Sequence, residues 1–191
     1  MARKWLKYTS LLFLGAVSVA VIAVLIMQRV SDGPMEMLQG GPFRTGELIT
    51  EPVTDWSFAL ERPVQFELVG FGTSRTAGYI VHDGIAYMTC DLGFIWSRLE
   101  PGATKSILSL IYRFKRWHLD AVEDGRALIR DGDSIYPVNF VKVEDPGLNA
   151  ILRMEMEELA SSYFAPGALG PAPVEPPNDV WFFRMDPRDP G

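Results

Sequence analysis

RTAGYIVHDGIAYMTC, the stretch from Arg75 to Cys90, decides the class of fold. Two apolar runs in it flank the dipeptide Asp83-Gly84, and both residue types readily adopt the positive φ that a type I′ turn requires. Apolar, β-branched and aromatic residues bounded by such a turn are typical of paired antiparallel strands. The stretch is therefore predicted to be a β-hairpin.

A second hairpin is predicted from Ala127 to Val143, which reads ALIRDGDSIYPVNFVKV. Its turn is expected at Asp131-Gly132 for the same reason as in the first hairpin. Pro137 has no N–H to donate to a neighbouring strand, so it is expected at an edge position or a bulge of the second strand.

Periodicity predicts further elements on both sides of the hairpins. The run VQFELV alternates as a half-buried strand does, and VWFFRM is rich in aromatic residues. Apolar residues between the hairpins recur at near-helical spacing. The expected elements are strands at Val64–Val69 and Val180–Met185 and a helix at Ser106–Val122.

Another helix is expected to begin after Asp145, which suits an N-cap, with Pro146 at the first helical position. Its carboxylates Glu155, Glu157 and Glu158 are interpreted as its solvated face. An apolar stripe is expected to bury the other face. This stripe comprises Leu148, Ile151, Leu152, Leu159 and Tyr163.

The order of these elements is strand, hairpin, helix, hairpin, helix, strand. Hairpins with interspersed helices favour a mainly antiparallel β structure in which the helices lie at the periphery. The fold is therefore predicted to be an antiparallel β-barrel with peripheral helices.

The stretch from Tyr8 to Met27 holds twenty residues without a charge. As a helix it would rise about 30 Å, the thickness of the hydrocarbon core of a bilayer, so it is predicted to be a membrane anchor. A cleaved signal peptide is the alternative, because Arg3, Lys4 and Lys7 form a basic leading region. The bulky apolar residues continue past Ala20, which favours the anchor.

Basic residues near the span predict its orientation. Three of them precede it, whereas only Arg29 follows it closely, so the N-terminus is expected in the cytoplasm. The soluble domain would then be periplasmic or extracellular. The single cysteine, Cys90, cannot form an intramolecular disulfide and gives no information about the redox state of that compartment.

The charge and the length of the chain after the apolar span limit its possible partners and its number of domains. After position 30 there are 14 basic and 24 acidic residues, a net charge of −10 that argues against nucleic acid as a partner. About 160 residues remain, enough for one domain. The expected organisation is a cytoplasmic stub and transmembrane helix over residues 1–30, a glycine-rich linker over 31–45, and one soluble domain over 46–191.

Sequence motifs of catalysis are largely missing. The chain has no GxGxxG, GxxxxGK[ST], GxSxG or HExxH motif. Two histidines and one cysteine cannot form a usual tetrahedral zinc site without carboxylates, so no metal is predicted. Cys90 is interpreted as a small buried hydrophobic residue rather than a nucleophile.

One stretch of the acidic domain is basic. Between Pro101 and Leu119 there are four basic and no acidic residues. They could neutralise a phosphate or carboxylate, with Trp117 packed on a ring, or rest on anionic lipid beside the anchor. The alternative is a solvated helix face that pairs with neighbouring carboxylates.

Four segments together resemble the split-barrel flavin-binding superfamily, which contains the pyridoxamine 5′-phosphate oxidases and the deazaflavin-dependent nitroreductases. They are similar to a basic-hydroxyl strand with its hairpin, a Lys-x-Trp stretch before paired strands, the helix that follows, and the last strand. The segments are Phe71–Met88, Lys115–Val138, Asp145–Phe164 and Val180–Arg188.

The resemblance implies a six-stranded split barrel that binds FMN or a deazaflavin. The positions that match its phosphate-binding and ring-binding residues are Arg75, Thr76, Lys115 and Trp117. It also implies a membrane-anchored oxidoreductase that acts on a small molecule of unknown identity, and a homodimer, since such relatives are often dimers. The alternative is a non-catalytic binding or scaffold domain that kept the barrel and lost the cofactor.

Overall fold

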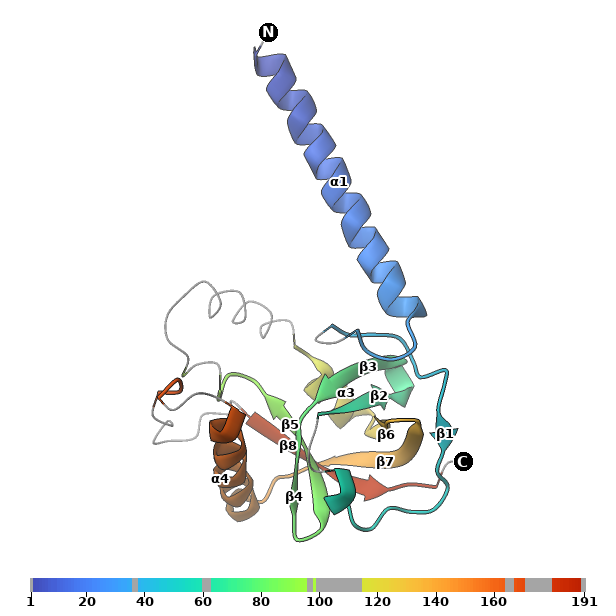
Figure 1. Cartoon of the computed structure of the whole chain (residues 1–191), viewed down its shortest axis with the longest axis vertical. Helices are drawn as coiled ribbons and strands as arrows, with labels where there is room; N and C mark the ends of the chain where they lie inside the picture. Colours follow the sequence, from blue (N-terminus) through green and yellow to red (C-terminus); the bar gives the residue numbers. More distant parts are fainter. Residues whose placement is uncertain are drawn as a thin grey trace.

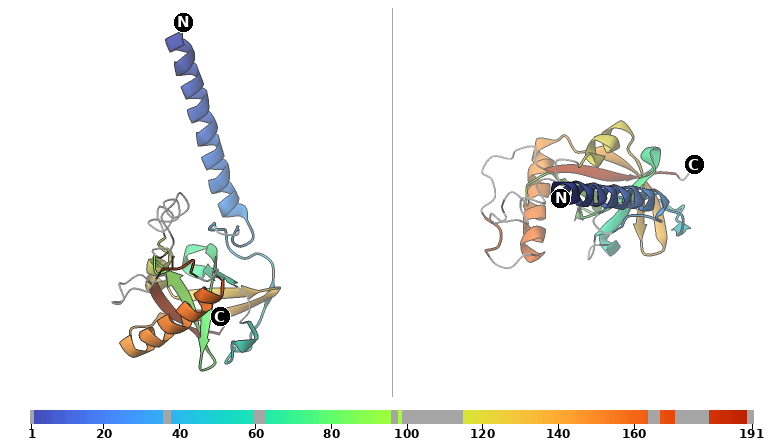
Figure 2. Two further views of the ribbon diagram at one scale, coloured as in Figure 1. Left: turned by 60° about the vertical axis from the view of Figure 1, so that its left-hand side comes forward. Right: turned by 90° about the horizontal axis from the view of Figure 1, so that it is seen from above.

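The computed structural model describes residues 2–35, 38–59, 63–95, 98, 115–163, 167–170 and 180–189. It consists of a long N-terminal helix, α1, that projects from a β domain (Figure 1). Seen from above, α1 stands over the domain rather than beside it (Figure 2).

Helix α1 runs from Ala2 to Val30 and is about 43 Å long. Its segment Leu12–Val30 has a mean hydropathy of 2.1, and none of it is buried against the rest of the chain. The predicted apolar helix is thus present, and it is long and apolar enough to cross a membrane.

One sheet forms the β domain, and its hydrogen-bonded neighbours follow the order β3-β2-β6-β7-β8-β5-β4. All neighbours in this path are antiparallel, while the two-residue strand β1 (Glu47–Leu48) pairs in parallel with β7. The strands of the path are β2 (Val64–Leu68), β3 (Thr73–Ala77), β4 (Tyr79–His82), β5 (Ile85–Asp91), β6 (Arg126–Asp131), β7 (Ser134–Lys142) and β8 (Val180–Pro187).

The two end strands of this path, β3 and β4, are separated in sequence by Gly78 alone. They form one bent strand whose first half pairs with β2 and whose second half pairs with β5. At the bend, the backbone N–H of Thr89 donates to the carbonyl oxygen of Gly78 at 3.1 Å. The sheet therefore curls back on itself, which confirms the predicted antiparallel barrel, with six strands when the bent strand is counted once.

The two faces of the curled sheet bury different clusters. Neighbouring residues of a strand point to opposite faces, so Met88 and Phe183 lie in one cluster and Tyr87 and Phe182 in the other. The barrel interior is filled by side chains that include Phe66, Leu68, Met88, Trp117, Ile129, Phe140 and Phe183. The outer cluster packs under helix α4 and includes Ile80, Tyr87, Leu152, Met156, Val180 and Phe182.

Helix α4 extends from Pro146 to Tyr163, as predicted. The carboxylate Oδ1 of Asp145 accepts from the backbone N–H of Leu148 at 2.6 Å, which confirms the N-cap. The buried stripe differs from the expected one: Leu152 is fully buried, whereas Ile151 is 37% exposed. Met156 and Ala160 complete the buried stripe, because residues four apart stack on one face of a helix.

The glutamates of α4 are not all solvated, contrary to expectation. Glu155 Oε1 lies 2.7 Å from Nδ1 of His82, which ties α4 to β4. Glu157 forms an ion pair with the guanidinium of Arg98, through both carboxylate oxygens. Only Glu158 is exposed. The partners come from distant parts of the chain, so spacing within the helix could not reveal them.

Helix α3 runs from Trp117 to Glu123. It confirms the end of the helix predicted at 106–122, and the earlier part of that helix, up to residue 114, lies outside the described residues. Trp117, His118 and Ala121 are its buried residues.

The first hairpin turns at Asp83 and Gly84, whose φ angles are 51° and 77°, as predicted. In the second hairpin Asp131 pairs with Ser134, so the turn residues are Gly132 and Asp133, one position later than predicted.

Pro137 lies in β7 where the partner strand on one side changes. Strand β1 pairs with β7 at positions 134 and 135, and the pairing with β8 begins at Val138. Pro137 thus occupies a local edge, as its missing N–H predicted.

Candidate functional site

The four residues matched to a flavin site do not form one cluster. Arg75 lies on β3 opposite the fully buried Phe66, so its side chain points into the barrel. Thr76 follows it along the strand, points to the other face and is exposed. One Nη2 hydrogen of Arg75 is donated to Oε1 of Gln39 at 2.5 Å.

Trp117 is part of the barrel core. It is 2% exposed, and its ring centroid lies 4.8 Å from that of Phe66 and 5.5 Å from that of Phe183. Aromatic rings at these distances are in packing contact. The indole is therefore enclosed by other side chains and does not present a face for a cofactor ring.

Lys115 lies at the entrance to α3, and its Nζ donates to the carbonyl oxygen of Asp91 at 2.7 Å. The same ammonium group acts on Cys90, as does the guanidinium of Arg75. Arg75 and Lys115 thus both lie near enough to Cys90 to stabilise its thiolate electrostatically, a proximity that the sequence did not predict.

Burial dominates the electrostatics around Cys90. It raises the pKa of the Cys90 thiol to about 12, and the nearby cations offset only part of this effect. Burial also raises the pKa of Asp91 and lowers that of Arg75. Cys90 is therefore a protonated, inert thiol at neutral pH, as predicted.

Two buried nitrogen atoms near this region lack a hydrogen-bond partner within the described ranges. They are Nε of Arg75 and Nδ1 of His118. His118 is 8% exposed, and burial, with Lys115 adding to the effect, lowers its pKa. Unpartnered buried polar atoms are rare in folded proteins, and a bound ligand or a water molecule commonly accounts for them.

The fit to a flavin phosphate is therefore partial. Arg75 and Lys115 both act electrostatically on Cys90, but Thr76 faces away and Trp117 is enclosed. Among the described residues, no group of three or more histidine, cysteine or acidic side chains could hold a metal ion.

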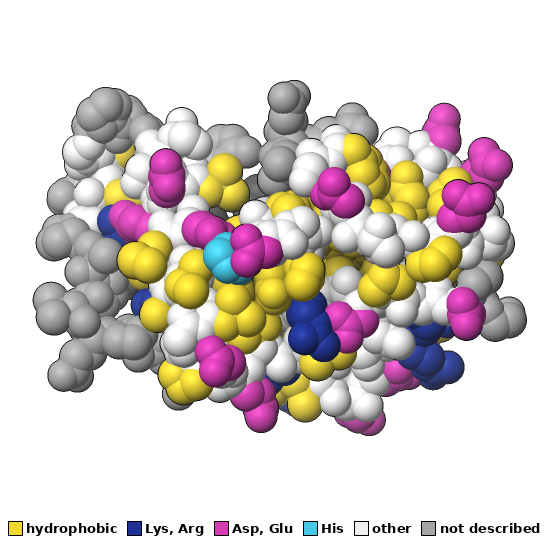
Figure 3. Space-filling view, turned by 90° about the horizontal axis from the view of Figure 1, so that it is seen from below, with side chains coloured by type: hydrophobic (Ala, Val, Ile, Leu, Met, Phe, Trp, Pro, Cys, Tyr) yellow, Lys and Arg dark blue, Asp and Glu magenta, His cyan; other side chains and the backbone are white. Residues whose placement is uncertain are grey.

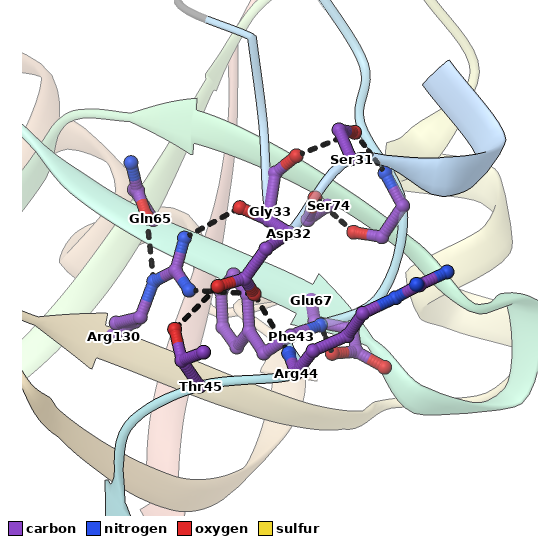
Figure 4. A network of polar contacts seen from close by, with 11 residues as sticks. Ser31, Asp32, Gly33, Phe43, Arg44, Thr45, Gln65, Glu67, Ser74 and Arg130 are labelled. Carbon is purple, nitrogen blue, oxygen red and sulfur yellow. Dashed lines mark hydrogen bonds and ion pairs between the residues drawn. The ribbon is translucent and has the colours of Figure 1, made fainter. Parts of the chain in front are cut away.

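A better-defined polar site joins α1 to the barrel (Figure 4). Asp32 Oδ1 accepts from the backbone N–H of Arg44 at 2.7 Å and from Nη1 of Arg130 at 3.0 Å. Its Oδ2 accepts from the hydroxyl of Thr45. These contacts, the Thr45 hydrogen bond above all, lower the pKa of Asp32 to about 2.

Arg130 connects this site to the sheet. Its Nε donates to Oε1 of Gln65 at 2.8 Å, and Nη2 donates to the carbonyl oxygen of Asp32 at 3.1 Å. Its guanidinium lies 4.2 Å from the ring centroid of Phe43. The backbone N–H of Phe43 in turn donates at 2.6 Å to Glu67, a buried carboxyl whose pKa is raised by burial.

The segment that enters the barrel pairs with β3. Gly40 and Ser74 exchange two backbone hydrogen bonds, of 3.0 and 3.1 Å. A Cβ on Gly40 would lie 1.8 Å from the carbonyl oxygen of Gly33, and one on Gly41 would lie 2.6 Å from that of Ser31. Only glycine permits so close a backbone approach.

The described residues of 31–45, a stretch that the sequence suggested as a linker, thus form hydrogen bonds with β2, β3 and β6. We call the contacts of Asp32, Arg130, Thr45 and Phe43 the junction. The sequence did not predict the junction because glycine-rich segments are usually flexible, whereas the glycines of this segment allow a close approach of the backbone. The only available signal was the recurrence of small residues at positions 31, 33, 40 and 41.

The structure defines a class, a curled antiparallel barrel joined to an apolar N-terminal helix. Comparison with family models, with curated protein sequences and with solved structures gives no match to this chain.

Proposed function

We propose that this chain is a single-pass membrane protein whose barrel is a non-catalytic binding or scaffold domain outside the cytoplasm. The observation that carries the proposal is the junction, because it fixes the barrel directly to the end of α1. A fixed attachment is useful to a domain that must present a surface at a defined height and orientation. The enclosed Trp117 and the outward Thr76 support the absence of a complete flavin site.

The proposed orientation follows from charge. Arg3, Lys4 and Lys7 precede the apolar span, and only Arg29 follows it closely. Basic residues are retained on the cytoplasmic side, so the barrel would lie on the opposite side.

A flavin-dependent oxidoreductase is the second candidate. It is favoured by the unpartnered Nε of Arg75, which lies buried in the barrel end that also holds Lys115. These two side chains would bind an anionic phosphate, and a bound flavin would itself supply hydride transfer. A small-molecule substrate and a homodimer would belong to this candidate.

The test is the visible absorption of the full chain purified in detergent, followed by a fluorescence titration with FMN. A colourless protein without saturable FMN uptake supports the binding-domain proposal. Flavin absorption, or uptake that is lost in Arg75→Ala and Lys115→Ala but kept in Thr76→Ala, would support the oxidoreductase instead. Circular dichroism confirms that each variant is folded.

A further inference from the structure

Three aromatic rings gather at the end of the barrel that is turned away from α1. The ring centroid of Phe58 lies 5.8 Å from those of Trp56 and Tyr136, which are 5.5 Å from each other. Trp56 is 2% exposed and belongs to the barrel core, whereas Phe58, in the short helix η1 (Ser57–Ala59), is 57% exposed. Figure 1 shows η1 beside the β4–β5 turn, opposite to α1. The Phe58 ring therefore stacks on the indole of Trp56 and leaves much of its own surface open to solvent.

Two acidic residues lie at the same place. Oδ1 of Asp55 accepts from the backbone N–H of Ser57 at 2.9 Å and from its hydroxyl at 2.6 Å, at the start of η1. The same oxygen lies 4.0 Å from where a Cβ on Gly84 would be, and the carbonyl oxygen of Gly84 accepts from the N–H of Trp56 at 3.4 Å. Asp83, the residue before Gly84, has an 88% exposed side chain. We call these two acidic residues and the three aromatic ones the distal patch.

Neither carboxylate of the distal patch is neutralised by lysine or arginine within the described residues. The hydrogen bonds from Ser57 lower the pKa of Asp55, so this carboxyl is ionised at neutral pH. Asp83 has His82 beside it, with Nε2 at 3.6 Å, but Nδ1 of His82 is already bonded to Glu155 at 2.7 Å. Two negative charges thus stand next to an exposed aromatic ring.

The wider face around the patch is also acidic. Figure 3 shows this face, on which acidic side chains surround apolar ones and basic side chains are fewer. Arg184, which like Asp83 acts electrostatically on Tyr87, is paired with Asp186 through hydrogen bonds of 2.6 and 2.9 Å. The charge of the face is therefore complementary to a basic partner, and it would be repelled by a membrane that holds anionic lipid.

The junction shows what a phenyl ring beside a carboxylate binds in this chain. The guanidinium of Arg130 lies 4.2 Å from the ring centroid of Phe43, and its Nη1 lies 3.0 Å from Oδ1 of Asp32. A second set of this kind comprises Arg98, Phe94 and Glu157. A planar guanidinium can stack on a ring and pair with a carboxylate at the same time. Phe58 and Asp55 offer the same two partners, and no arginine of the described chain occupies them.

We propose that the distal patch binds an arginine side chain in a basic segment of a partner protein. The guanidinium stacks on Phe58 and pairs with Asp55 or Asp83. Arginine is favoured over lysine because its planar group is weakly hydrated and matches both a ring and a carboxylate. The inference rests on the proposed function as a binding domain and names the chemistry of the partner.

The experiment uses the full chain in neutral detergent micelles, labelled with 4-fluorophenylalanine. Phe58→Leu assigns the fluorine signal of Phe58 by its absence. The probe is a short peptide of alternating glycine and arginine, blocked at both ends, and the matched probe carries citrulline, which has a similar shape but no charge. The chain with both Asp55→Asn and Asp83→Asn removes the charges, while asparagine still suits an N-terminal turn and a positive φ. Asp133→Asn removes an exposed acidic residue of the other hairpin turn and is the control.

The expected result is a saturable shift of the Phe58 signal, with an affinity about ten-fold higher for the arginine peptide than for the citrulline peptide. The double asparagine variant should lose about ten-fold in affinity, and Asp133→Asn should bind as the native chain does. No saturable shift, equal affinity for the citrulline peptide, or an equal loss in Asp133→Asn would overturn the distal patch as an arginine site.

Two further outcomes have separate meanings. Saturable FMN uptake in the absorption and fluorescence test contradicts the proposed function, whereas a chain without FMN uptake that also ignores the arginine peptide overturns the distal patch alone. In nanodiscs, broadening of the Phe58 signal by a nitroxide-labelled lipid would show a bilayer on the patch, which also overturns the inference.

Discussion

Replacing Asp32 by asparagine should lower the free energy of unfolding of the barrel by about 1 to 2 kcal/mol near pH 7. The carboxylate accepts hydrogen bonds from the backbone N–H of Arg44, the hydroxyl of Thr45 and Nη1 of Arg130. An asparagine keeps one acceptor oxygen, loses the other and removes the charge that Arg130 faces.

The magnitude follows from the pKa of Asp32, which folding lowers from 3.8 to about 2. A difference of that size corresponds to at most about 2.5 kcal/mol of stabilisation by the ionised form. The side chain of Asp32 is 32% exposed, so solvent screens part of the interaction. About half of the upper value is therefore expected, with a further contribution from the lost acceptor.

The pH dependence has a defined sign. Because the folded-state pKa lies below the unfolded value, the contribution is fully present above the unfolded pKa of 3.8 and is lost as pH falls through about 2. The difference in unfolding free energy between the native chain and Asp32→Asn should thus be constant from neutral pH down to about pH 5 and should shrink below about pH 4.

Urea denaturation of the full chain in detergent micelles, followed by tryptophan fluorescence, measures both effects. Trp56 and Trp117 are 2% exposed and report on the barrel core. Asp133→Asn is the control, since Asp133 is an exposed turn residue next to the same hairpin. Equal destabilisation by both variants, or a difference for Asp32→Asn that does not change with pH, would refute the reasoning.

Three further variants or probes test the core, the junction and the thiol. In urea denaturation, Trp117→Ala should lower the free energy of unfolding by about 3 to 5 kcal/mol, whereas Thr76→Ala should change it by about 0.5 kcal/mol or less. A Trp117→Ala chain as stable as the native one would contradict the placement of Trp117 in the core. Gly40→Ala should lower Tm by about 5 °C or more because the new Cβ meets backbone, while Gly15→Ala in α1 should leave Tm unchanged. Cys90 should react with maleimide about 100-fold more slowly in the folded chain than in urea, and comparable rates would contradict its burial.

Elements with a local cause could be predicted from the sequence. The turn at Asp83-Gly84 depends on the φ preferences of two adjacent residues, and the N-cap at Asp145 depends on a hydrogen bond three residues away. Pro137 likewise lacks a backbone N–H whatever its neighbours are, so its position at a local edge could be expected from the residue itself. Each of these features depends only on neighbouring residues, so it can be predicted without knowledge of the rest of the chain.

The sequence could not predict that the first strand of the first hairpin is divided between two partner strands. The run that begins at Arg75 reads as one continuous strand, yet its first half pairs with β2 and only the part after Gly78 pairs with β5. Alternation predicts that a segment is a strand, but it does not identify the partner. The closure of the barrel depends on that choice of partner.

The arrangement of the candidate site residues could not be predicted for a similar reason. Sequence indicates which residues carry charge or an aromatic ring, and it led to Arg75, Lys115 and Trp117. Whether a side chain is enclosed depends on distant residues, such as Phe66 and Phe183 around Trp117. The junction was missed because Asp32 and its partner Arg130 are far apart in sequence.

Retention of α1 in the membrane tests the central claim most directly. Membranes that contain the expressed chain are extracted with alkaline carbonate, and the intact mass of the protein is measured in the pellet and in the supernatant. We expect the pellet to hold a chain that still contains Ala2–Val30. A shorter chain that lacks this helix and appears in the supernatant would contradict it.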